Sequence, residues 1–145
     1  TRFKNYKSDV FLNVGCFEGL FFPAKFLDSI VVDFQKYFIG EDDTIFGVNL
    51  SLVCPIKYVW RAKMIRQIYP PNAIAAWKSY YVIRNQLYLY ADIQKLTRNH
   101  SRVSFIIICL IILRKFITMT AKNPRCFIPA LKGTIAGFSY VFSSK

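Results

Sequence analysis

The segment VSFIIICLIILRKFITM, residues 103–119, is the most apolar part of this chain. Its uninterrupted apolar run, from Phe105 to Leu113, has nine residues, whereas a helix that crosses a bilayer needs about 20. Arg102 precedes the segment, and Arg114 and Lys115 follow the run directly. The pattern predicts a helix that does not cross a membrane. It leaves two placements open, namely a helix in the plane of the membrane interface and a buried core helix.

Charge is distributed unevenly along the 145 residues. The chain has 20 Lys and Arg residues against 8 Asp and Glu residues, a formal net charge of +12. Residues 1–50 hold five basic and seven acidic residues, whereas residues 51–145 hold fifteen basic residues and one acid, Asp92. Such a basic half suits an anionic partner, either a membrane surface or a nucleic acid. The apolar run at 105–113 favours the membrane, and we expect no nucleic-acid binding.

Hydrophobic periodicity and turn residues divide the rest of the chain. Pro70 and Pro71 interrupt it, and Asn72 is suited to cap a long helix that follows. Residues 44–53 fit a helix or a strand equally well. The remaining expected elements are two strands joined by a turn at 10–22, a short helix at 26–31, a strand at 56–60, a long helix at 73–98 and a short helix at 130–138.

The cysteine and histidine residues do not predict a metal site. Cys16, Cys54, Cys109 and Cys126 show no CxxC spacing, and His100 is the sole histidine. Isolated buried thiols in a reducing compartment are the expected arrangement. No basic-then-apolar leader opens the sequence, so we expect no signal segment.

Three adjacent acids, Glu41, Asp42 and Asp43, lie in the stretch YFIGEDDTIFG at 37–47, between apolar flanks. One interpretation is a solvated turn ahead of a helix, whose N-terminus favours negative charge. The other is a reactive site, because a carboxylate in apolar surroundings holds a proton more readily and can act as a general base toward a hydroxyl.

Three segments resemble the C-terminal half of family 2 glycosyltransferases, close to the bacterial rhamnosyltransferase and galactofuranosyltransferase group. They are GLFFPAKFLDSI at 19–30, YFIGEDDTIFG at 37–47 and YYVIRNQLYLY at 80–90, in this order, and the resemblance covers about residues 10–95. It implies an α/β fold, with residues 1–69 as the acceptor-side, C-terminal portion of a GT-A domain. Residues 70–145 would then form a helical, basic and apolar tail that associates with the membrane surface.

The resemblance also implies a chemistry. The enzyme would transfer a sugar, with rhamnose as the suggested one, from a nucleotide sugar to a polysaccharide or lipid-linked acceptor, with inversion. It would act peripherally at the cytoplasmic face of the cell membrane. Asp43 would be the general base, with Asp42 and Glu41 orienting the acceptor or tuning the base. Arg84, in the YYxxRN match, and Arg66, where the family often has a cation-holding His, would bind substrate.

The sequence departs from the family pattern at several positions. Gly40 and Glu41 stand where the family usually has Trp and Gly, and Ile45 and Asn49 where it usually has Glu and Arg. No DxD motif of a nucleotide-sugar half occurs, so Mg²⁺ or Mn²⁺ is expected only in a full-length enzyme and none is supported by this chain. The alternative function is therefore a non-enzymatic, membrane-associated remnant.

Overall fold

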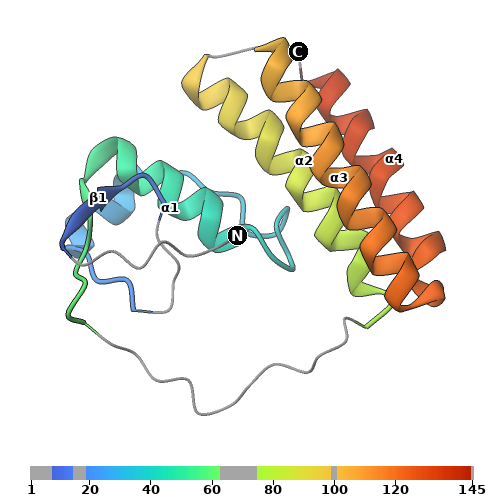
Figure 1. Cartoon of the computed structure of the whole chain (residues 1–145). Helices are drawn as coiled ribbons and strands as arrows, with labels where there is room; N and C mark the ends of the chain where they lie inside the picture. Colours follow the sequence, from blue (N-terminus) through green and yellow to red (C-terminus); the bar gives the residue numbers. More distant parts are fainter. Residues whose placement is uncertain (1–7, 15–18, 63–74, 99–100, 145) are drawn as a thin grey trace. The chain divides into compact units, whose positions relative to one another are not determined.

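The computed structural model describes residues 8–14, 19–62, 75–98 and 101–144. The chain folds into two compact units. We call Thr1–Asp33 with Asp43–Pro70 the strand unit, and Phe34–Asp42 with Pro71–Lys145 the bundle unit. The elements, in chain order, are strand β1 (Val10–Leu12), 3-10 helix η1 (Ala24–Ser29), helix α1 (Asp42–Val53), strand β2 (Ile56–Tyr58), helices α2 (Lys78–Thr97) and α3 (Arg102–Lys122), 3-10 helix η2 (Pro124–Cys126) and helix α4 (Phe127–Ser143) (Figure 1).

The strand unit is built around one short antiparallel ladder and one helix. β1 pairs with β2 so that Leu12 lies opposite Ile56. α1 contributes Phe46 and Leu50, which are buried with Ile56 in the small core of this unit. An ion pair of 2.9 Å between the Lys57 ammonium and the Asp9 carboxylate also joins the two strands.

The expected α/β fold of the GT-A type is wrong for the described residues, which are mostly helical. Their sheet has two strands of three residues each, paired antiparallel, whereas an α/β fold needs parallel strands joined through helices. Residues 15–18 of the expected strands at 10–22 lie outside the described residues; among the described residues of 10–22 and 56–60, the paired strands are Val10–Leu12 and Ile56–Tyr58. The segment that fitted either state, 44–53, lies within α1.

The long helices of the bundle unit, α2, α3 and α4, lie side by side (Figure 1). α2 and α4 approach closely because α4 carries glycines where they meet. A Cβ atom added to Gly133 would lie 2.3 Å from the Tyr80 carbonyl oxygen, and one added to Gly137 would lie 2.5 Å from Leu87 Cδ1. The spacing of these two glycines is the GxxxG pattern that brings apolar helices together. α4 is also longer than the short helix expected at 130–138.

α3 covers the predicted helix at 103–119 but leaves most of its apolar side chains exposed. Ile112 is its buried residue, and it packs in a core with α2 and α4. Two helical stretches, Arg102–Lys122 and Pro124–Ser143, are long and apolar enough to span a membrane. The length of the run at 105–113 therefore does not exclude a crossing, contrary to the sequence-based expectation. The remaining members of the core are Ile83, Leu87, Ala91, Ala130 and Val141.

Candidate functional site

The three acids follow a backbone turn in the left-handed region. Gly40 has φ of 78° and Glu41 has φ of 69°, and α1 begins at the next residue, Asp42. Glycine adopts this conformation without cost, whereas a residue with a side chain, such as Glu41, is held there by its surroundings. Asp42 and Asp43 thereby occupy the first turn of α1, where the helix dipole favours carboxylates. All three acids are half-buried.

The loop ahead of the acids is held by Asn85, which is completely buried on α2. Its side-chain amide donates hydrogen bonds to the carbonyl oxygens of Ile39, at 2.8 Å, and Gly40, at 3.0 Å. Its side-chain oxygen accepts a hydrogen bond of 3.0 Å from Nε of Arg84. The two residues that end the YYxxRN match thus act together, and one of them fixes the backbone that leads into Glu41.

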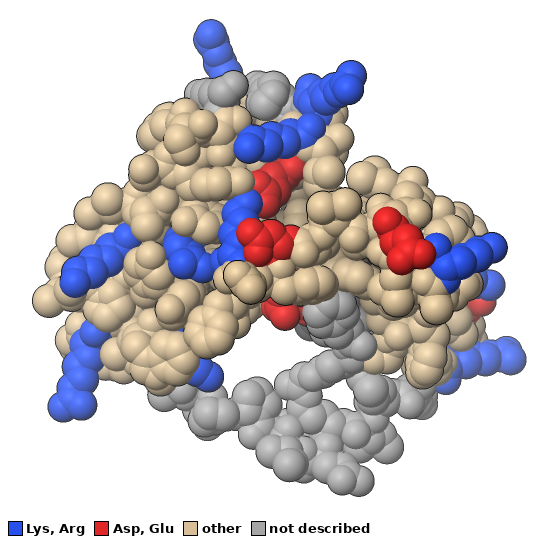
Figure 2. Space-filling view, turned by 180° about the vertical axis from the view of Figure 1, so that it is seen from behind, with Lys and Arg blue, Asp and Glu red and all other residues tan. Residues whose placement is uncertain are grey.

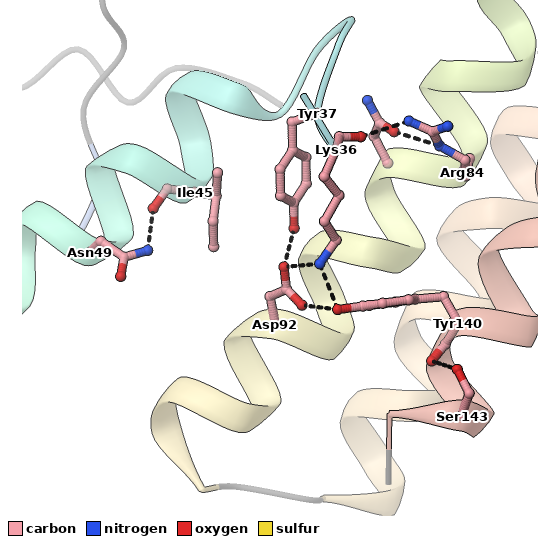
Figure 3. Close-up of polar contacts among 9 residues, drawn as sticks. Lys36, Tyr37, Ile45, Asn49, Arg84, Asp92, Tyr140 and Ser143 are labelled. Atoms are coloured by element: carbon pink, nitrogen blue, oxygen red, sulfur yellow. Dashed lines mark hydrogen bonds and ion pairs between the residues drawn. The ribbon is translucent and has the colours of Figure 1, made fainter. Parts of the chain in front are cut away.

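Arg84 fixes the same loop from its other end. Its guanidinium donates a 2.7 Å hydrogen bond to the Lys36 carbonyl oxygen (Figure 3). The guanidinium also lies 4.9 Å from the ring centroids of Tyr81 and Tyr88, which is within cation–π range. Among the described residues Arg84 forms no ion pair with an acid. Its contacts favour a role in positioning the loop, and the expected contact with substrate stays a prediction.

A cluster around Asp92 fastens the start of this loop to both α2 and α4 (Figure 3). The Asp92 carboxylate accepts hydrogen bonds from the Lys36 ammonium at 2.5 Å, the Tyr37 hydroxyl at 2.7 Å and the Tyr140 hydroxyl at 2.8 Å. The Lys36 ammonium also donates to the Tyr140 hydroxyl, at 2.6 Å. We call these four residues, Lys36, Tyr37, Asp92 and Tyr140, the Asp92 cluster.

Burial and charge complement each other in the Asp92 cluster. Tyr37 is only 2% exposed, and this burial, together with the Asp92 carboxylate, raises the pKa of its hydroxyl well above the ordinary value for tyrosine. The Lys36 ammonium lies 4.1 Å from the centroid of the Tyr140 ring. The Asp92 carboxylate and the face of this ring therefore both stabilise its positive charge. Sequence analysis missed this cluster, although Asp92 stood out as the one acid of residues 51–145.

The other expected site residues are placed as follows. Arg66 and Cys16 lie outside the described residues. Within the described ranges, the thiols of Cys54, Cys109 and Cys126 form no disulfide. In the same ranges no group of three or more His, Cys, Asp or Glu residues is arranged to hold a metal ion.

Exposed apolar side chains on α3 and α4 form a second candidate site, which we call the apolar face. Its members are Val103, Ile106, Ile107, Leu110, Ile111, Leu113, Ile117, Phe127, Ile128, Leu131, Ile135 and Phe142. Ile106 is 58% exposed and Ile135 is 63% exposed. So many large exposed apolar residues exceed what an ordinary soluble surface carries and indicate an interaction with an apolar partner.

Basic side chains accompany these apolar residues. Arg102, Arg114, Lys122, Arg125 and Lys132 are all exposed on α3, η2 and α4. In the view of Figure 2, Lys and Arg side chains are spread over the surface, with a few acidic side chains among them. Comparison of the chain with protein-family models, with curated proteins and with solved structures finds no match.

Proposed function

We propose that this chain is the acceptor-side part of a sugar-transferring enzyme that works at the cytoplasmic face of a membrane. One observation carries the proposal. Asn85 and Arg84, from one of the three motifs that suggested the function, bind the backbone of residues 36–40, which leads into the acids of another. Gly40 of one motif and Asn85 of the other, 45 positions apart in sequence, are therefore in contact within the bundle unit.

The proposed chemistry is an inverting transfer. A base removes the proton of an acceptor hydroxyl as that oxygen attacks the anomeric carbon of the donor sugar, and the bond from this carbon to the nucleoside diphosphate breaks, so that the nucleoside diphosphate leaves on the opposite face. Asp43 is the proposed base, and Asp42 and Glu41 orient the acceptor. The donor is a nucleotide sugar and the acceptor a glycan or a lipid-linked sugar. A divalent cation does not fit the described residues, because they hold no suitable group of ligands, so no step assigned to this chain uses one.

The arrangement of the bundle unit favours attachment to the membrane surface over a crossing. α4 packs tightly along α2, so if α4 entered the hydrocarbon then α2 would enter with it. α2 carries Arg84 and Asp92, and a charged residue at the centre of a membrane helix costs roughly 2.5–3.5 kcal/mol on insertion scales. The non-helical backbone of 36–41, which is pinned to α2, would be carried along as well.

We therefore propose that α3 and α4 lie in the plane of the membrane, with the apolar face toward the acyl chains. Each buried large apolar side chain supplies roughly 1.5–3 kcal/mol. Each nearby cation adds about 1 kcal/mol at an anionic surface. The second candidate function is a membrane-associated module without catalytic activity. The apolar face supports this function too, because it accounts for attachment to a membrane whether or not the chain catalyses a reaction.

The test uses the full-length protein that contains this chain, supplied with nucleotide sugars and a membrane lipid extract as acceptor. The release of nucleoside diphosphate is measured. We expect Asp43→Asn to lower the rate by roughly 10²–10⁴-fold, the usual contribution of a general base. Asp28→Asn, at an exposed acid on η1, is the matched control and should leave the rate unchanged.

Two results would count against the proposal in different ways. An Asp43→Asn variant as fast as the wild type would remove the assignment of the base. A wild-type protein that releases no nucleoside diphosphate from any donor, yet still binds vesicles, would favour the non-enzymatic module.

A further inference from the structure

The last turn of α4 belongs both to the apolar face and to the Asp92 cluster. The Tyr140 hydroxyl donates to the Asp92 carboxylate at 2.8 Å and accepts from the Lys36 ammonium at 2.6 Å (Figure 3). Phe142, two residues further on, is 58% exposed and is a member of the apolar face. Side chains two positions apart on a helix are separated by about 200° around its axis. Tyr140 and Phe142 therefore lie on opposite sides of one turn.

This turn is the end of a helix, which opens more readily than the centre. The last four carbonyl groups of an α-helix have no partner within the helix, and no residue of the last turn of α4 is basic, so no side chain there offsets the helix dipole. Helix ends fray for these reasons. Val141 is the residue of this turn that packs in the core. The contacts of Tyr140 with Lys36 and Asp92 exist only while the turn is ordered.

Hydrogen bonds connect Tyr140 to the loop ahead of the acids. The Lys36 side chain is held by Tyr140 and Asp92, and the Lys36 carbonyl oxygen accepts from Arg84. Tyr140 is the member of the Asp92 cluster that comes from α4. Glu41, at the other end of the loop, lies close enough to the cluster to be among the causes that raise the pKa of Tyr37. Opening of the last turn of α4 therefore removes one of the fastenings of this loop.

A membrane would favour the ordered state of the turn. The apolar face is continuous with Phe142 only while the last turn is helical, so lipid binds the ordered turn better than the open one. Full burial of a phenylalanine side chain is enough to change such an equilibrium roughly tenfold or more. Because Tyr140 lies in the same turn, its contacts with the loop are stabilised together with the contact of Phe142 with lipid.

We propose that attachment to a membrane regulates the loop ahead of the acids by ordering the last turn of α4, and that Tyr140 transmits the effect. In water the turn opens for part of the time and the loop then loses its contact with α4, whereas at a membrane both stay fastened. Tyr140 is a positioning residue, since it acts through Lys36 and Asp92. The inference rests on the membrane location in the proposed function but not on sugar transfer.

The experiment measures hydrogen exchange of the amides at 36–41 in the full-length protein, with and without vesicles that contain phosphatidylglycerol. In the wild type we expect vesicles to slow this exchange roughly two- to tenfold, because they suppress the open state of the turn. Tyr140→Phe keeps the ring and removes both hydrogen bonds of the hydroxyl. It should still sediment with vesicles, exchange roughly tenfold faster than the wild type without them, and show no slowing when they are added. Slowing equal to that of the wild type would overturn the proposal.

Two further variants separate the transmitted effect from shielding by the vesicle. Tyr90→Phe is the matched control, because it removes the hydroxyl of a tyrosine whose ring lies near Phe105, outside the Asp92 cluster, and it should behave as the wild type. Phe142→Gln leaves the other members of the apolar face in place and should still sediment with vesicles. In this variant vesicles should no longer slow exchange at 36–41. A slowing as large as in the wild type would refute the role of the last turn.

The outcomes distinguish a failure of the regulation from a failure of the proposed function. If the wild type binds vesicles and its exchange at 36–41 is unchanged, the regulation is refuted and the membrane location stands. If the wild type binds no vesicles, both are refuted. If Tyr140→Phe does not fold, the comparison of Phe142→Gln with the wild type decides, because the Phe142 side chain is exposed.

Discussion

Replacement of Asn85 by alanine should loosen the loop ahead of the acids more than any other single change on α2. The substitution removes three hydrogen bonds: two donated to the carbonyl oxygens of Ile39 and Gly40, and one accepted from Arg84. Each such bond contributes about 0.5–1.5 kcal/mol net. Gly40 is exposed, so water can replace its bond, and we expect a net loss of about 2–3 kcal/mol in the free energy of unfolding.

Asn85→Asp provides a sharper version of the same test. The aspartate keeps the shape of the side chain and still accepts from Arg84. However, it directs a carboxylate at two carbonyl oxygens that the amide of Asn85 had bound. We therefore expect it to be at least as destabilising as alanine.

The assay is urea unfolding followed by circular dichroism, together with hydrogen exchange of the amides at 36–41. The matched control is Asn49→Ala, because the amide of Asn49 donates one bond of 2.9 Å to Ile45 within its own helix. Its loss should cost no more than about 1 kcal/mol. The reasoning is refuted if Asn85→Ala is no more destabilising than Asn49→Ala and the exchange at 36–41 is unchanged.

Three further predictions concern the bundle unit. Gly133→Ala should lower the free energy of unfolding by about 1–3 kcal/mol, because its Cβ would press on the Tyr80 carbonyl oxygen; a rise in melting temperature, as helix propensity alone predicts, would contradict the close contact of α2 and α4. The pKa of Tyr37 is raised in the folded state, so the unfolded chain releases this proton first and the wild type should lose stability as the pH rises above about 10. Tyr37→Phe should lose less stability between pH 8 and pH 11, and urea midpoints that fall equally in both proteins would contradict this. Ile106→Glu with Leu110→Glu should abolish sedimentation with anionic vesicles, and undiminished binding would show that the apolar face does not touch lipid.

The helices were the most predictable part of the fold. The apolar composition of 103–119 predicted a helix there, and α3 covers that segment. α4 extends beyond both ends of the helix expected at 130–138. Gly133 and Gly137 disfavour a helix in isolation, whereas in the bundle they allow the contact with α2. A preference measured residue by residue does not include that contact.

The α/β expectation failed because it came from the resemblance and not from the pattern of the residues. The apolar stretches at 10–22 and 56–60 were compatible with strands, but of their described residues three from each stretch pair in the ladder. Strand pairing depends on partners that are distant in sequence, which a local pattern does not specify.

The assignment of Arg84 and of the acids at 41–43 as site residues stays a prediction. The motif match named these residues, but not Asn85 as the residue that holds the loop ahead of the acids, nor the Asp92 cluster. Both features depend on contacts between residues that are about 45 to 104 positions apart. Two signals were present in the sequence. The Arg84-Asn85 pair lies among apolar and aromatic residues, and Asp92 is the one acid of residues 51–145.

The Asp92 cluster has a consequence for the order in which the chain folds during synthesis. Lys36 reaches Tyr140 across 104 positions, so residues 34–42 emerge from the ribosome long before the helix that completes their contacts. At about 5–20 residues per second, the loop waits for several seconds or more until α4 follows. A nascent chain stopped before α4 would already hold the residues of α2 that bind this loop, but not Tyr140, which completes the Asp92 cluster. Arrested chains of increasing length, probed by limited proteolysis at residues 34–42, should gain partial protection once α2 has left the exit tunnel and full protection only once Tyr140 has left it.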